Sequence, residues 1–126
     1  FLLGLEQPTL IEKAVRLASK AVALHPNDFR LLDTYGFALF LQRDYLQAEI
    51  YLRRAIERAE AAQKEDPSSV STASLAEYYY HYAKVQEEVG NLQTSLLFLQ
   101  KVKQLVSTDE IDLAIEEIKR RMESSK

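Results

Sequence analysis

Apolar residues recur along this chain at intervals of three and four, and almost no stretch alternates apolar and polar positions as a half-buried strand would. The pattern breaks at the three prolines and at Gly90, whose tolerance of a positive φ suits the residue that follows a helix. It predicts six helices and no sheet, over residues 9–26, 27–43, 45–65, 73–89, 92–106 and 107–126. The predicted fold class is therefore all-α.

Polar residues at the starts of these runs favour the same boundaries. Thr9 with Glu12, and Ser107 with Glu110, have the spacing of a capping box, in which two side chains satisfy free backbone N–H groups. Asp44 is placed to cap the run that follows it. We therefore expect the first helix to begin at Thr9 and the last at Ser107.

The helical runs repeat along the chain. A first set of positions recurs after 34 residues: Ile11, Ala14, Ala18, Ala21 and Val22 correspond to Tyr45, Ala48, Leu52, Ala55 and Ile56. A second set recurs after 47 residues, which is 34 plus a 13-residue insertion: Leu32, Tyr35, Gly36, Tyr45, Ala48, Leu52 and Ala55 correspond to Tyr79, Tyr82, Ala83, Leu92, Ser95, Leu99 and Val102. A helix pair repeated at this length is the signature of a solenoid.

These positions resemble the tetratricopeptide repeat. The segment from Phe29 to about Gln63 has the family's pattern in order, as Leu32, Tyr35, Gly36, Leu39, Tyr45, Ala48, Leu52 and Ala55. The later unit departs from it at Gln86, where the family prefers an apolar residue, and at Ser95, where it has alanine. The resemblance implies a right-handed superhelical stack of antiparallel helix hairpins, with about two and a half repeats and a C-terminal capping helix.

We expect one domain over residues 1–126. Its predicted parts are a partial first repeat at 1–28, a second repeat at 29–63, an insertion or loop at 64–75, a third repeat at 76–107 and a capping helix at 108–126. The last helix has one apolar side, formed by Ile111, Ala114, Ile115, Ile118 and Met122. The chain opens inside a repeat at Phe1, so we expect a fragment of a longer repeat protein.

The resemblance also implies that the first helix of each pair lines a concave groove. The residues that fall on this face in the second repeat are Arg30, Asp33, Phe37, Phe40 and Leu41. Those of the third repeat are Glu77, Tyr80, Lys84, Glu87 and Glu88. If the two phenylalanines and the leucine are exposed together, they form an apolar patch of the kind that marks a contact surface. The alternative is that the missing first helix of the partial repeat, or the opening segment FLLGL, covers them within the chain.

Four tyrosines and a histidine occupy residues 78–82. Tyr79 and Tyr82 correspond to Leu32 and Tyr35, so we expect them in the core, while Tyr78 lies on the flank of the same apolar stripe. We found no nucleophile with a positioned base beside His81. The sequence therefore favours neither an enzyme nor a metal site, and it implies no cofactor.

Composition and charge exclude several classes of partner and of chemistry. The net charge is −3, which argues against nucleic-acid binding, and the absence of cysteine excludes thiolate chemistry. No apolar run approaches the length of a membrane span. A subset of the tetratricopeptide family holds the C-terminal carboxylates of chaperones with a clamp of lysine, asparagine and arginine. The corresponding positions here are Asp33, Phe37, Glu77 and His81, and the aspartate where that clamp needs a lysine disfavours this ligand. The compartment is left open, with the cytoplasm slightly favoured.

These observations predict a protein–protein interaction scaffold that binds a partly apolar peptide or helix in the groove. One alternative is a homo-oligomerisation module in which Phe37 and Phe40 are buried between copies. Another is a regulatory or recruiting domain attached to an upstream enzyme. The sequence does not distinguish among these three functions.

Overall fold

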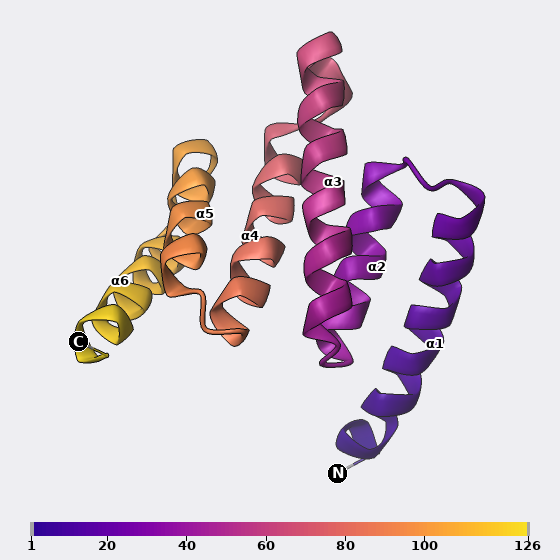
Figure 1. Ribbon diagram of the computed structural model, residues 1–126, viewed down its shortest axis with the longest axis horizontal. Helices are drawn as coiled ribbons and strands as arrows, with labels where there is room; N and C mark the ends of the chain where they lie inside the picture. Colours follow the sequence, from indigo (N-terminus) through magenta and orange to yellow (C-terminus); the bar gives the residue numbers. More distant parts are fainter. Residues whose placement is uncertain (1, 126) are drawn as a thin grey trace. The chain divides into compact units, whose positions relative to one another are not determined.

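The computed structural model describes residues 2–125, and their side chains from Thr9 onward. All regular elements in this range are helical, which confirms the predicted all-α class (Figure 1). There are six α-helices and one short 3₁₀ turn among the described residues: α1 Leu2–Leu24, α2 Phe29–Leu41, α3 Tyr45–Glu65, η1 Pro67–Ser69, α4 Thr72–Glu88, α5 Leu92–Leu105 and α6 Asp109–Ser124. Neighbours in the chain pack in pairs: α1 on α2, α4 on α5, and α5 on α6.

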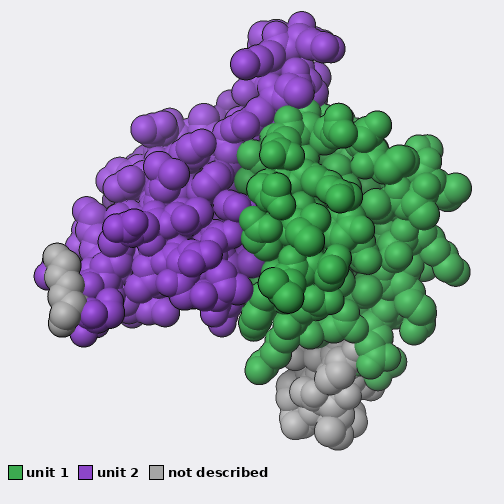
Figure 2. All heavy atoms as spheres, in the orientation of Figure 1, with its two compact units in different colours: residues 1–58 green, residues 59–126 purple. Residues whose placement is uncertain are grey.

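The chain divides into two compact units, residues 1–58 and 59–126, with the boundary inside α3 (Figure 2). The first holds α1, α2 and most of α3, and the second holds the end of α3 and the three later helices. The predicted repeat boundaries at 29–63 and 76–107 stay predictions.

Helix ends follow local hydrogen bonding. Asp28 caps α2, because its side chain accepts the N–H of Arg30 at 2.9 Å, and Asp44 accepts the N–H of Gln47 at the start of α3 at 3.3 Å. The expected cap at Asp44 is confirmed.

Two expected capping boxes are wrong. Thr9 lies inside α1, which begins at Leu2, in an opening segment rich in leucine, a residue that favours helix. The cap of α6 is Thr108, whose hydroxyl accepts the N–H of Ile111 at 3.2 Å. Thr108 has the extended φ and ψ of an N-cap, so α6 starts one residue later than the Ser107 box predicts.

One turn occurs twice, 47 residues apart. Gly90 has the expected positive φ, of 88°, and Arg43 has a φ of 68° at the corresponding place between α2 and α3. The residue after each donates its N–H to a carbonyl five residues earlier: Asp44 to Leu39, and Asn91 to Gln86, both at 2.9 Å. The 47-residue correspondence is confirmed for this turn, since the same left-handed residue ends both helices.

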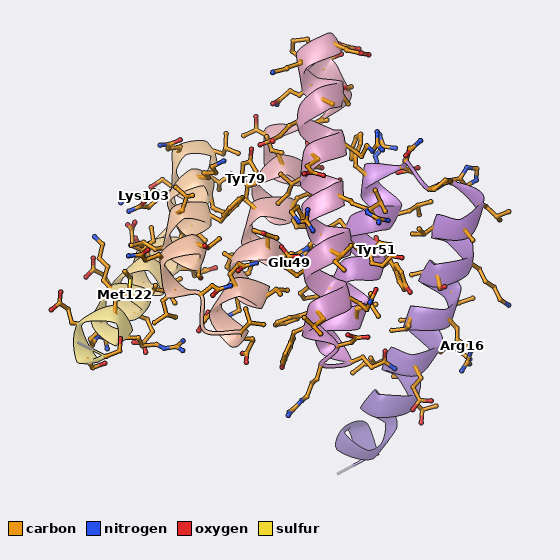
Figure 3. The ribbon with its side chains drawn as sticks, viewed as in Figure 1. Arg16, Glu49, Tyr51, Tyr79, Lys103 and Met122 are labelled. Atoms are coloured by element: carbon orange, nitrogen blue, oxygen red, sulfur yellow. The ribbon has the colours of Figure 1, made fainter. Side chains whose placement is uncertain are left out.

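In the first unit, α2 packs closely against α3. Val22, Leu32 and Ala55 form a buried cluster with Tyr35 and Tyr51 packed against it. The two tyrosine rings meet edge to face with centroids 4.6 Å apart, and Tyr51 is labelled on α3 in Figure 3.

In the second unit, the tyrosine run is mainly core. Tyr79 and Tyr82 are buried as expected, and their rings contact Phe98 of α5 at centroid distances of 5.7 and 4.7 Å. Tyr79 is labelled on α4 in Figure 3. The Tyr79 hydroxyl donates a hydrogen bond to Glu60 at 2.6 Å. Burial, followed by this bond to a carboxylate, raises the pKa of Tyr79 far above its usual range.

The two departures from the repeat pattern are both accommodated by hydrogen bonds. Ser95 is fully buried, and its hydroxyl donates to the carbonyl of Ala83 at 2.9 Å. Gln86 is buried as well, and its side-chain oxygen accepts from the Asn91 amide at 2.9 Å. A polar side chain is tolerated at each position because its polar atom has a partner.

The last helix packs through the side that the sequence predicts. Ile111, Ile115 and Ile118 of α6 are buried, whereas Leu113, an apolar residue outside this side of the helix, is exposed. Arg121 also joins α6 to α4, through an ion pair with Glu87 at 2.8 Å.

Candidate functional site

A cavity of about 370 Å³ opens in the second unit among α4, α5 and α6. We call it the α4–α6 slot. Its walls are the start of α4, the end of α5 and the start of α6, which the hydrogen-bonded turn at Thr108 brings into place. The residues that line it are Ala73, Ala76, Glu77, Tyr80, Val102, Val106, Thr108, Glu110 and Ile111.

The slot has an apolar wall and an acidic rim. Its apolar surface comes from small and aliphatic residues on all three helices, together with the half-buried Tyr80. Its two charged residues are Glu77 of α4 and Glu110 of α6, and both are exposed. The slot can therefore hold an apolar side chain while offering carboxylates at its edge.

Further acidic residues surround the start of α6. Asp109, Glu110 and Asp112 all fall in its first turn, where carboxylates are favoured by the partial positive charge of a helix N-terminus. Asp112 is neutralised by Lys103, whose ammonium lies 2.8 Å away, and this pairing raises the pKa of Lys103. Asp109 and Glu110 keep the rim negative, because two full charges exceed the roughly half charge of the helix end.

Two of the predicted groove residues in this unit point to structural roles. Glu87 pairs with Lys84 at 3.4 Å and with Arg121 at 2.8 Å, so it ties α4 to α6. The Lys84 ammonium also lies 6.0 Å from the centre of the Tyr80 ring. The structure thus brings Glu77 and Tyr80 together in the slot, while Lys84 and Glu87 form an ion pair outside its lining.

The predicted groove residues of the first unit lie on α2. Phe37 and Phe40 are half-buried and stacked, with ring centroids 5.6 Å apart. Arg30 is exposed, with its guanidinium 5.3 Å from the centre of the Phe29 ring, whereas Asp33 is only 4% exposed. The suggestion that FLLGL covers the phenylalanines concerns side chains outside the described residues. Whether these residues bind a partner stays a prediction.

Leu41 faces a second cavity, of about 440 Å³, between α1 and α2. It is lined by Leu10, Ile11, Ala14, Ala38 and Leu41. Three leucines of α1 are also largely exposed to solvent. The exposed fractions of Leu10, Leu17 and Leu24 are 56%, 61% and 76%. Sequence reasoning missed these three leucines, although they recur every seven residues in the sequence, beginning one residue before Ile11.

Sequence reasoning also missed most of the slot. Val102, Val106, Thr108, Glu110 and Ile111 come from α5, its following loop and α6, whereas the predicted groove used first helices alone. The apolar spacing did place Ile111 on the packing side of the last helix. What it could not show is that the neighbouring Glu110 would share a cavity with Glu77.

Comparison with known proteins supports the fold. No protein-family model matches the chain, and no curated protein matches it. Among solved structures, it is similar to the N-terminal domain of stress-induced protein-1 (STI-1) from C. elegans, with a TM-score of 0.68 and 9% identity, over 90% of this chain and 95% of that one. This similarity supports the predicted stack of helix hairpins, and at such low identity it carries no information about the site. Within residues 2–125, no helix is long and apolar enough to cross a bilayer.

Proposed function

We propose that this chain is a non-enzymatic protein-binding scaffold, and that the α4–α6 slot receives an apolar side chain from a peptide or helix of another protein. The observation that carries the proposal is the slot itself, a concave site of about 370 Å³ with an aliphatic wall and few polar groups. Sites of this kind are typical of ligand and peptide recognition.

The polar groups of the slot favour binding over catalysis. The Thr108 hydroxyl already accepts the N–H of Ile111, so it serves as a helix cap. The two glutamates are exposed to water and come from different helices, which suits charge pairing with a ligand.

Phe37, Phe40 and Leu41 on α2 are proposed as a further apolar contact for the same class of partner.

A selection from a random peptide library tests this function. Ala73 is exposed and lines the slot, so Ala73→Phe should fill it without entering the core. Thr72→Phe is the matched control, because Thr72 is exposed at the start of α4 and does not line the slot. We expect the unmodified protein and the control to enrich the same apolar peptides, and Ala73→Phe to lose them. Equal enrichment on Ala73→Phe, at unchanged helicity, would refute the slot as the binding site.

Self-association is the alternative use of the apolar surfaces. It predicts a solution mass that rises with concentration and depends on Phe37 and Phe40. Sedimentation equilibrium over a wide concentration range distinguishes it, since a strict monomer at high concentration contradicts it. Recruitment for an attached enzyme would use the same peptide-binding surface.

A further inference from the structure

We propose that the α4–α6 slot selects basic peptides: an apolar side chain enters the slot, and lysine or arginine residues within a few positions of it pair with Glu77 and Glu110. This inference rests on the proposed function and specifies its ligand. The proposed charge preference is opposite to that of a groove that binds C-terminal carboxylates with lysine.

The apolar part of the ligand follows from the walls. Ala73 and Ala76 leave room on the α4 side, and Val102, Val106 and Ile111 supply branched aliphatic surface opposite. An aliphatic or aromatic side chain that enters this space loses its contact with water, which is the main favourable term for such an anchor. One anchor alone gives weak binding after the cost of association, so flanking contacts decide selectivity.

The basic part follows from charge complementarity. Of the nine residues that line the slot, two are charged, and both are glutamates that come from different helices. Asp109 adds a third exposed carboxylate at the start of α6. A peptide threading between α4 and α6 therefore meets negative potential on both helices, which attracts cations and repels acidic sequences.

The nearby cations leave this potential in place. Lys103 is engaged with Asp112 at 2.8 Å, and Lys84 is engaged with Glu87 at 3.4 Å. His81 has a ring nitrogen within 4.8 Å of the Glu77 carboxylate, so binding is compared at one fixed pH throughout.

Three synthetic peptides with capped ends and the same leucine anchor test the inference. They differ only in the flanking residues, which are lysine, serine or glutamate, and their binding is followed by fluorescence anisotropy at low ionic strength. We expect affinity to fall in the order lysine, serine, glutamate. The lysine peptide should also weaken as salt is raised, because exposed ion pairs are screened.

Paired substitutions assign the effect to the rim. Glu77→Gln with Glu110→Gln should weaken the lysine peptide about tenfold, roughly threefold for each exposed ion pair, and leave the serine peptide unchanged. Glu57→Gln with Glu65→Gln is the control, because it removes the same charge from exposed positions of α3 that do not line the slot. The control should leave both affinities unchanged.

The outcomes separate the two proposals. If the serine and lysine peptides bind equally, or the glutamate peptide binds best, the charge inference is overturned and the scaffold function stands. The control pair is Glu57→Gln with Glu65→Gln. If it lowers the affinity for the lysine peptide as much as Glu77→Gln with Glu110→Gln does, the peptide is attracted by the net negative charge of the chain and not by the slot. That result also overturns the charge inference. If none of the three peptides binds and the peptide library enriches no sequence, the proposed scaffold function is refuted, and the charge inference that rests on it is refuted with it.

Discussion

Gly36 lies where α2 packs against Leu52 of α3, and its substitution tests this packing directly. A methyl group placed on Gly36 would lie 2.6 Å from the Leu52 Cγ, 2.7 Å from its Cδ2 and 3.0 Å from its backbone nitrogen. Carbon atoms in contact prefer a separation of roughly 3.5–4.0 Å. Leu52 is fully buried, so its side chain cannot turn into solvent to make room.

The expected cost of Gly36→Ala is the difference between two effects. Alanine in a helix interior is favoured over glycine by about 1 kcal/mol. Overpacking a core costs about 1–3 kcal/mol, and the upper end applies here because a backbone atom is also too close. The free energy of unfolding should therefore fall by about 2 kcal/mol, and Tm by about 8 °C for a chain of this length.

A double-mutant cycle identifies the cause. Leu52→Ala alone should cost about 2–5 kcal/mol, because it leaves a cavity between α2 and α3. In the Leu52→Ala background, the two side-chain clashes are removed and only the approach to the backbone nitrogen at 3.0 Å is left, so Gly36→Ala should be close to neutral, a coupling of about 2 kcal/mol. Urea unfolding followed by circular dichroism measures all four proteins. Thr34→Ala, on the exposed side of α2, is the control without a packing change, and it also removes the hydrogen bond from the Thr34 hydroxyl to the Arg30 carbonyl. The packing argument is wrong if Gly36→Ala changes the free energy of unfolding by the same amount in the unmodified chain and in the Leu52→Ala variant.

Three further predictions concern single sites. Arg43→Gly should raise the free energy of unfolding by about 1 kcal/mol and Gly90→Ala should lower it by about 1 kcal/mol, because both positions have a positive φ that side chains disfavour; urea unfolding measures each, and a destabilising Arg43→Gly or a stabilising Gly90→Ala would contradict the shared turn. Tyr79→Phe should cost about 1 kcal/mol near neutral pH by removing the hydrogen bond to Glu60. Since folding raises the pKa of Tyr79 above its ordinary value of 10.0, the unmodified protein should lose stability as pH rises beyond that value, and the variant should lose less. Ser95→Ala should cost under about 1 kcal/mol, whereas Ser95→Val should cost about 2 kcal/mol by overpacking a fully buried position; equal thermal midpoints would count against this.

The helical fold was predictable because its signals are local. Apolar spacing identifies each helix, and Asp44 and Gly90 act through hydrogen bonds or φ angles within a few residues. The errors at Thr9 and Ser107 have the same origin: each has a plausible capping partner, and the sequence does not tell which of several polar residues adopts the extended cap geometry. The left-handed Arg43 could be found only by its register with Gly90, because its side chain gives no local signal.

The site was predictable only in part, because it depends on how helices meet. Glu77 and Tyr80 followed from the register of the first helix in the repeat, and both line the slot. Val106 and Glu110 could not be assigned, since they reach the slot through the packing of α6 against α5. Burial of Asp33, placed on the groove face by the same register, shows that a shared helical position does not fix exposure.

The position of Glu110 follows from the core of α6, and this makes the acidic rim a stable property of the fold. The buried residues Ile111, Ile115 and Ile118 fix the rotation of α6 about its axis, and Ile111 also lines the slot. Glu110 directly precedes Ile111, so its carboxylate is held at the slot edge by packing elsewhere in the helix. A helix of the same length and packing could have any residue at this exposed position. A chain that shares this hairpin stack at 9% identity therefore need not share the acidic rim, on which the proposed selection of basic peptides depends.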